Sequence, residues 1–186
     1  MTVTAELDAR FREAATRAGL VDVAYDIVET PIGNLLVGMS DGGVCRISFD
    51  PEPEREVEIL AKSHGVRVLR APRPVDPARH ELDEYFAGRR RDFELRTDLR
   101  LVADFNRRVL AELRRVPYGQ VTTYGELAVR ANAPRAARAV GVVMNRNPIP
   151  IVLPCHRVIG KNGKLVGYGG GLERKEALLR LEGALL

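Results

Sequence analysis

Three short apolar runs in the N-terminal half, separated by turns that contain glycine, predict β-strands. These runs are Val23–Glu29, Leu35–Met39 and Val44–Phe49. Because so few residues connect them, neighbouring strands are expected to pair as a small antiparallel meander. Apolar residues at helical spacing predict three helices in the same half, over residues 1–19, Glu52–His64 and Pro77–Phe86.

The C-terminal half is predicted to be mostly helical. Phe105–Arg114 carries its apolar residues on one face. Thr123 and Glu126 have the spacing of a capping box, which opens a short helix ending at Arg130. A second helix is expected over Pro134–Asn145, because proline suits the first position of a helix. Two short helices about a tight turn form a helix-turn-helix, a motif that often has only a structural role.

The chain is expected to form two domains in an α+β fold. The highly charged segment Gly88–Leu99 is the predicted linker, which places the domains at residues 1–98 and 99–186. With 45% hydrophobic and 29% charged residues, the composition is typical of a globular protein. The first residues do not resemble a signal peptide, and no run approaches the roughly 18 apolar residues of a membrane span. We therefore expect a cytoplasmic protein that does not contact a membrane.

Charge is distributed unevenly between the two halves. Residues 1–100 hold 15 Lys/Arg against 19 Asp/Glu, a net charge of −4, whereas residues 101–186 hold 14 against 6, a net charge of +8. A basic half is a candidate surface for a polyanion such as nucleic acid. The alternative is an ordinary solvated face.

The second helix of the helix-turn-helix combines small residues with two arginines. Arg135 and Arg138 are three positions apart, which places them on one side of a helix that includes both. Ala137 and Gly141 are among the small residues that would let this helix lie close to a surface. In a DNA-binding protein it would be the recognition helix. Otherwise it packs through its alanines and leaves the arginines in water.

Only two cysteines are present, and they lie in unlike contexts. Cys45 lies in an apolar strand, whereas Cys155 lies between a proline and a histidine. A disulfide is not expected in a cytosolic chain without framework spacing. The other soft ligands are His64, His80 and His156, and no pair has the spacing of a zinc site, so no metal is expected.

The segment leading to Cys155 is stiff. Three prolines in seven residues, Pro148 to Pro154, fix an extended approach, as suits a nucleophile that must be aimed. A buried thiol needs a base to remove its proton, and His156 is adjacent. A carboxylate should orient the imidazole, and on residue type alone Glu182 and Glu176 are equal candidates. The alternative is a small buried hydrophobic cysteine without chemistry.

The string Pro154–Val158, which reads PCHRV, resembles the active-site motif of the O6-alkylguanine-DNA alkyltransferases, also called methylated-DNA–protein-cysteine methyltransferases. The Asn-Pro-x-Pro sequence at Asn147 and the downstream Gly-Gly-Leu and Leu-Leu-x-x-Glu-Gly sequences belong to the same resemblance. It extends from about Phe105 to Gly183 and is fainter over Tyr25–Phe49. It implies a ribonuclease-H-like N-terminal support domain and a DNA-binding, alkyl-accepting C-terminal domain without a cofactor.

The resemblance also implies roles for single residues. Cys155 would accept the alkyl group, His156 would reach it through a water, and Glu182 rather than Glu176 would hold His156. Asn147 would brace the active-site loop against the helix-turn-helix.

Further implied roles concern DNA and the lesion. Arg138 would fill the gap left by the flipped base, and Tyr124 would push the neighbouring phosphate and give the base a proton. The expected DNA-binding residues are Arg138, Arg135, Tyr124, Ala137 and Gly141, and the expected pocket residues are Val158, Tyr168, Gly169 and Pro150. Gly169 departs from the Ser or Ala that is common in the family, so only its backbone amide could bind O6.

The implied reaction moves an alkyl group from O6 of guanine in double-stranded DNA, or less well from O4 of thymine, to Cys155. The thioether product has no carbonyl for water to attack, so one monomeric chain is expected to repair one lesion; cooperative binding along DNA stays open. Two other functions remain as alternatives. A Cys-His-Glu hydrolase or acyltransferase would turn over on a carbonyl substrate. A binding protein for alkylated DNA would bind without transfer.

Overall fold

The computed structural model describes residues 4–185, which form two compact units. The first unit extends to Asp83 and includes Leu95–Asp98, and the second comprises Glu84–Glu94 and the chain from Leu99 onward. The segment 84–94 thus groups with the second unit, although it precedes residue 98 in the chain. The domain boundary between residues 98 and 99 stays a prediction.

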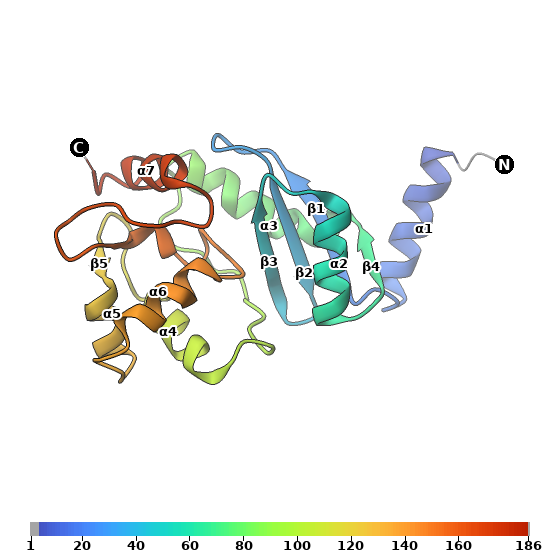
Figure 1. Ribbon diagram of the computed structural model, residues 1–186. Coiled ribbons are helices and arrows are strands. Elements are labelled where there is room, and N and C mark those ends of the chain that lie inside the picture. Colours follow the sequence, from blue (N-terminus) through green and yellow to red (C-terminus); the bar gives the residue numbers. More distant parts are fainter. Residues whose placement is uncertain (1–3, 186) are drawn as a thin grey trace. The chain divides into compact units, whose positions relative to one another are not determined.

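The first unit is built on a four-stranded sheet with the strand order β3-β2-β1-β4 (Figure 1). The strands are β1 (Val23–Val28), β2 (Leu35–Ser40), β3 (Gly43–Phe49) and β4 (Val68–Arg70). The first three form the predicted antiparallel meander. The fourth strand runs parallel to β1, which corrects the expectation of a purely antiparallel sheet. At three residues, β4 is too short to show a strand periodicity in the sequence.

Three helices belong to the first unit: α1 (Ala5–Arg17), α2 (Pro53–His64) and α3 (Pro72–Phe86), of which α3 ends in the segment that groups with the second unit. The helix α3 begins five residues before the predicted start at Pro77. Pro72 and Pro74 lie in its first turn, where backbone N–H groups have no partner within the helix, so a missing N–H costs little there.

Cys45 belongs to the core of the first unit. It packs with Val23 and Leu36 of the sheet and with Leu60 of α2. Burial raises the pKa of its thiol to about 12. Cys45 is therefore a small buried side chain rather than a nucleophile.

The second unit is mostly helical, with α4 (Asp104–Arg114), α5 (Tyr124–Arg130), α6 (Ala137–Asn145) and α7 (Leu172–Leu181). The helices α4, α5 and α6 pack on one another, and the pair α5 and α6 is the predicted helix-turn-helix (Figure 1). Their buried residues form the core: Val109, Leu110, Leu113, Leu127, Ala128, Val140, Val143 and Met144.

The predicted start of α5 is confirmed, and the predicted start of α6 is corrected. The capping box is present, since the Thr123 hydroxyl accepts from the Glu126 backbone N–H at 3.2 Å and the Glu126 carboxylate accepts from the Thr123 N–H at 2.9 Å. The helix α6, however, begins at Ala137 and not at Pro134. A turn closed by the N–H of Ala136 and the carbonyl of Ala133 precedes it. Arg135 therefore lies in that turn, and only Arg138 is on the helix.

A short parallel ladder connects α5 to the segment that carries the cysteine. It joins β5 (Thr122–Thr123) to β6 (Val158–Ile159), which follows the 3₁₀ turn η1 (Cys155–Arg157). Because β5 leads directly into α5, the first residue of that helix, Tyr124, is held close to the active-site segment. Within residues 4–185, no helix is both long and apolar enough to cross a membrane.

Candidate active site

Asn147 holds the loop that leads to Cys155. Its amide Nδ2 donates to the Leu153 carbonyl at 2.8 Å, and its Oδ1 accepts from the Ile149 N–H at 3.1 Å. Nδ2 also lies 3.2 Å from the Cys155 sulfur. Between these contacts Ile151 adopts a φ of 75°, a left-handed conformation that costs a β-branched residue on the order of 1–3 kcal/mol. The loop is thus held in one strained shape, and Asn147 contacts both its backbone and its sulfur.

The Cys155 thiol is buried. Burial raises its pKa to about 11, and this effect exceeds the opposing effects of the Asn147 hydrogen bond and the Lys175 charge. The thiol is therefore protonated at neutral pH in the absence of substrate, and a base must take its proton before it can attack carbon.

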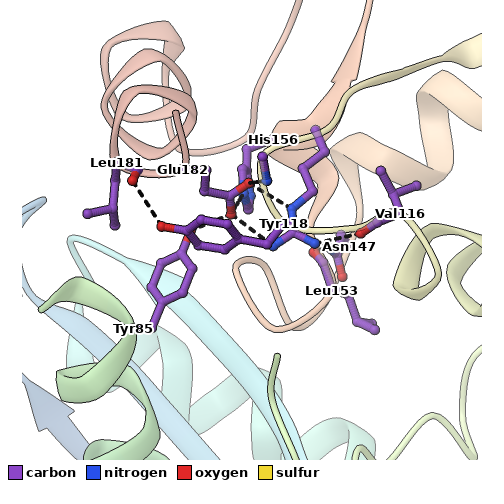
Figure 2. A network of polar contacts seen from close by, with 10 residues as sticks. Tyr85, Val116, Tyr118, Asn147, Leu153, His156, Leu181 and Glu182 are labelled. Carbon is purple, nitrogen blue, oxygen red and sulfur yellow. Dashed lines mark hydrogen bonds and ion pairs between the residues drawn. The ribbon is translucent and has the colours of Figure 1, made fainter. Parts of the chain in front are cut away.

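His156, which follows Cys155 in the same 3₁₀ turn, forms a buried pair with Glu182 at the end of α7. Nε2 of His156 lies 2.8 Å from Oε1 of Glu182 (Figure 2). Burial lowers the pKa of His156 despite the opposing effect of Glu182, so the imidazole is neutral at neutral pH. Since the carboxylate only accepts, Nε2 carries the proton and Nδ1 is a bare acceptor. Nδ1 is buried and has no hydrogen-bond partner among the described residues. The imidazole is thus set to receive a proton at Nδ1.

Glu182 is the carboxylate of this pair, and Glu176 is not. Glu182 follows the last residue of α7 and is buried, whereas Glu176 forms an exposed ion pair with Arg180 at 2.7 Å. Burial raises the pKa of the Glu182 carboxyl, but hydrogen bonds from His156 and Arg157 outweigh burial and lower it to about 2. Glu182 therefore stays ionised throughout the physiological range.

Sequence reasoning missed three other partners of this carboxylate. Arg157 donates from Nε and Nη2 at 2.9 Å each, and from Nη1 to the Val116 carbonyl at 2.6 Å. The Tyr85 hydroxyl donates at 2.7 Å and the Gly119 N–H at 3.3 Å. Arg157 was visible as part of the PCHRV string, but Tyr85 is 97 residues away in sequence and gave no signal.

Lys175 is a further residue that the sequence did not indicate. It is fully buried on α7, and its ammonium donates to the carbonyls of Val158 at 2.6 Å and Val166 at 2.9 Å. Burial lowers the pKa of Lys175 to about 8, against the opposing effect of Cys155. A positive charge thus lies near the thiol. By binding both carbonyls, Lys175 also holds together the two ends of the loop 159–165.

Tyr124 lies near Cys155, but its hydroxyl contacts a backbone carbonyl and not the sulfur. Its hydroxyl is 3.4 Å from the Val166 carbonyl, and its ring lies beside Gly141, where an added Cβ would be 3.8 Å from the ring. Burial raises the pKa of Tyr124, and the neighbouring Cys155 adds to the effect, so the phenol is protonated and can donate. Arg135 and Arg138 are exposed, and Ala137 is half-buried.

Of the predicted pocket residues, Pro150 and Val158 lie on either side of Cys155 in sequence, and Tyr168 and Gly169 follow further along the chain. Val158 and Pro150 are buried, and burial together with Cys155 raises the pKa of Tyr168. At Gly169, an added Cβ would meet the Asn145 carbonyl oxygen at 3.6 Å, an ordinary contact. The space at this position therefore admits the Ser or Ala that is usual in the resembling family. Within residues 4–185, no group of three or more metal-ligating side chains is present.

Family models and known proteins match this chain over most of its length. Residues 104–184 match the family model "6-O-methylguanine DNA methyltransferase, DNA binding domain", and residues 23–99 match "6-O-methylguanine DNA methyltransferase, ribonuclease-like domain". The methylated-DNA–protein-cysteine methyltransferase of Mycobacterium bovis is 51% identical over 160 residues, which cover 86% of this chain and 92% of the relative. The corresponding protein of Methanosarcina barkeri is 42% identical over 162 residues, with 85% and 96% covered.

Solved structures give the same result. The crystal structure of Mycobacterium tuberculosis OGT in complex with DNA has a TM-score of 0.75 and 40% identity, with 87% of this chain and 93% of that chain covered. The O6-methylguanine-DNA methyltransferase of Pyrococcus kodakaraensis has a TM-score of 0.60 and 31% identity, with 87% and 99% covered. The chain belongs to the methylated-DNA–protein-cysteine methyltransferase family of DNA repair enzymes.

Proposed function

We propose that the protein repairs duplex DNA by moving the alkyl group from O6 of a guanine, and less readily from O4 of a thymine, irreversibly to Cys155. The observation that carries this proposal is a buried thiol in contact with Asn147, followed directly in the chain by a neutral histidine that is hydrogen-bonded to an ionised Glu182. Such a set can activate a sulfur nucleophile without a metal or cofactor.

The first step is extrusion of the damaged nucleotide, since O6 lies inside the base stack. Flipping costs a few kcal/mol, and less for a mispaired base. Arg138 is exposed on α6 and brings a cation with a flat face, which suits both phosphate neutralisation and replacement of the lost stacking. In this proposal Arg135, exposed in the turn before α6, contacts the DNA phosphate backbone, and the small residues Ala137 and Gly141 allow the helix to approach the DNA closely.

The second step is activation of the thiol. Nδ1 of His156 takes the proton of Cys155, through a bridging water, and the ionised Glu182 stabilises the imidazolium at Nε2. The Asn147 amide, 3.2 Å from the sulfur, donates to the thiolate as it forms. The nearby Lys175 ammonium favours the same negative charge.

The third step is displacement at the alkyl carbon. The sulfur forms a new bond to that carbon while the carbon–O6 bond breaks, and the electron pair of that bond stays on the guanine. Tyr124 then gives its phenolic proton to the guanine, so that the leaving group is a neutral guanine, which remains part of the DNA strand. Val158, Tyr168, Pro150 and the backbone amide of Gly169 are the proposed walls of the base pocket. Because a thioether is not hydrolysed by this set of residues, the chain acts once.

Intact-mass measurement after mixing with duplex DNA that holds one O6-methylguanine tests this function. The expected result is the mass of one methyl group per chain, absent in Cys155→Ser. Continued product formation beyond one per chain would favour the hydrolase alternative. DNA binding without any mass change would favour a binding protein.

A further inference from the structure

Tyr85 contacts the oxygen of Glu182 that also faces His156. Its hydroxyl donates to Oε1 at 2.7 Å, and Nε2 of His156 lies 2.8 Å from that same atom (Figure 2). The Tyr85 side chain is fully buried, near the end of α3 and in the segment that groups with the second unit. Its ring packs against Phe86, Phe93 and Tyr118 at centroid distances of 5.3, 5.3 and 6.1 Å. The ring is thus held by packing, and its hydroxyl is aimed at one acceptor.

The donors of Glu182 are divided unequally between its two oxygens. Oε1 accepts from Tyr85, His156 and Arg157, whereas Oε2 accepts from Arg157 and the Gly119 N–H. A carboxylate oxygen has two lone-pair directions, so three donors on Oε1 compete for the same charge. Each donor also restricts the rotation of the carboxylate. The Tyr85 phenol therefore both fixes Oε1 on the imidazole and reduces the charge that Oε1 offers to it.

We propose that Tyr85 is a positioning residue for alkyl transfer, whose hydroxyl sets the strength of the hydrogen bond between His156 and Glu182. The inference rests on the proposed function, in which His156 is the base. A weaker hydrogen bond to Glu182 makes the imidazolium a better acid, and a neutral imidazole persists to lower pH. Tyr85 thereby keeps His156 available as a base when the surroundings become mildly acidic.

The other groups around this contact are charged or titratable, and Tyr85→Phe substitutes none of them. Those that act on His156 are Glu182, Arg157, Lys175 and, by position, Cys155. Those that act on the Tyr85 phenol are Glu182, Arg157 and Tyr118, and Tyr168 is itself influenced by Tyr85. Tyr85→Phe removes a single donor, and Glu182 keeps the other four.

The direct test is NMR of histidine-labelled protein without DNA. The chain has three histidines, so His156→Gln identifies the His156 signal. In Tyr85→Phe the Nε2–H proton is expected to move downfield, because Oε1 now binds it more strongly. Site-specific incorporation of 3-fluorotyrosine at position 85, a stronger donor of nearly the same shape, is expected to move it upfield. An Nε2–H signal unchanged in both samples would overturn the inference, and this readout does not depend on any transfer activity.

The second readout is the pH dependence of single-turnover methyl transfer at saturating duplex DNA. Tyr85→Phe is expected to shift the acid limb upward by about half a pH unit, a ~threefold change in proton affinity, with a rate near that of the unaltered chain at alkaline pH. Tyr118→Phe is the matched control, since it removes a phenol that donates at 2.9 Å to the Leu181 carbonyl and not to the carboxylate. Tyr118→Phe should not shift the pH–rate profile. Equal profiles for Tyr85→Phe and the unaltered chain would contradict the inference, whereas absence of transfer in the unaltered chain would instead refute the proposed function.

Discussion

Substitution of Glu182 by glutamine should lower stability far more than any surface substitution. The carboxyl pKa falls from an ordinary value of 4.5 to about 2, so folding favours its ionised form by about 3 kcal/mol. Much of this is the interaction with the buried Arg157 guanidinium, which the substitution leaves without its counter-charge; breaking a buried pair costs on the order of 3–5 kcal/mol in total. For a chain of this size we expect the Tm to fall by about 10 °C.

The pH dependence of this loss follows from the direction of the shift. Because the pKa is lower in the folded state, the stabilisation is complete above pH ~4.5 and is lost as the pH falls toward about 2. Below pH ~4.5 the difference in Tm between Glu182→Gln and the unaltered chain should therefore shrink as the pH falls.

Differential scanning calorimetry from pH 8 to pH 3 measures both effects. Glu176→Gln is the matched control on the same helix, because its exposed ion pair with Arg180 contributes less than about 1 kcal/mol. A Glu182→Gln protein with a Tm as high as that of Glu176→Gln at pH 7 would refute the reasoning. A difference that grows as the pH falls below ~4.5 would refute the assigned sign.

Three further substitutions test separate parts of the site. Asn147→Ala removes the donor to the Cys155 sulfur and should slow methyl transfer ~10–100-fold in single-turnover assays, as expected for a hydrogen bond to a charged group; a rate within twofold of the unaltered chain would contradict this role. Arg138→Ala should slow transfer from duplex DNA at least ~tenfold, with little effect on free O6-methylguanine base, which needs no flipping; equal losses on both substrates would count against the assignment. Gly169→Ser should change the free energy of unfolding by less than about 0.5 kcal/mol in urea titrations, since its Cβ would lie 3.6 Å from the nearest atom, and a larger loss would mean that the loop is packed more tightly.

The elements with a strong local pattern could be predicted from the sequence. The three strands of the meander have apolar runs between glycine turns, and Thr123 with Glu126 specifies a helix start by local hydrogen bonds. The strand Val68–Arg70 could not be predicted, because its place is set by parallel pairing with β1, which is distant in sequence. The start of α3 was obscured by prolines that are harmless in a first turn.

The candidate site shows the same division. Cys155, His156 and Asn147 lie within ten residues of one another, so a motif could indicate them together. Glu182 and Glu176 were equal by residue type, and the choice depended on the resemblance rather than on pattern. Tyr85 and Lys175 are brought to the site by folding alone, and a buried lysine or tyrosine has no signature that separates it from an exposed one.

The most direct test of the central claim is to follow the fate of a labelled methyl group. Duplex DNA with one O6-(trideuteromethyl)guanine is mixed in excess with the protein, and the tryptic peptide that contains Cys155 is analysed by tandem mass spectrometry while the repaired guanine is counted. We expect one trideuteromethyl group on the Cys155 sulfur and one restored guanine for each chain. A label on another residue, or more than one restored guanine for each chain, would contradict it.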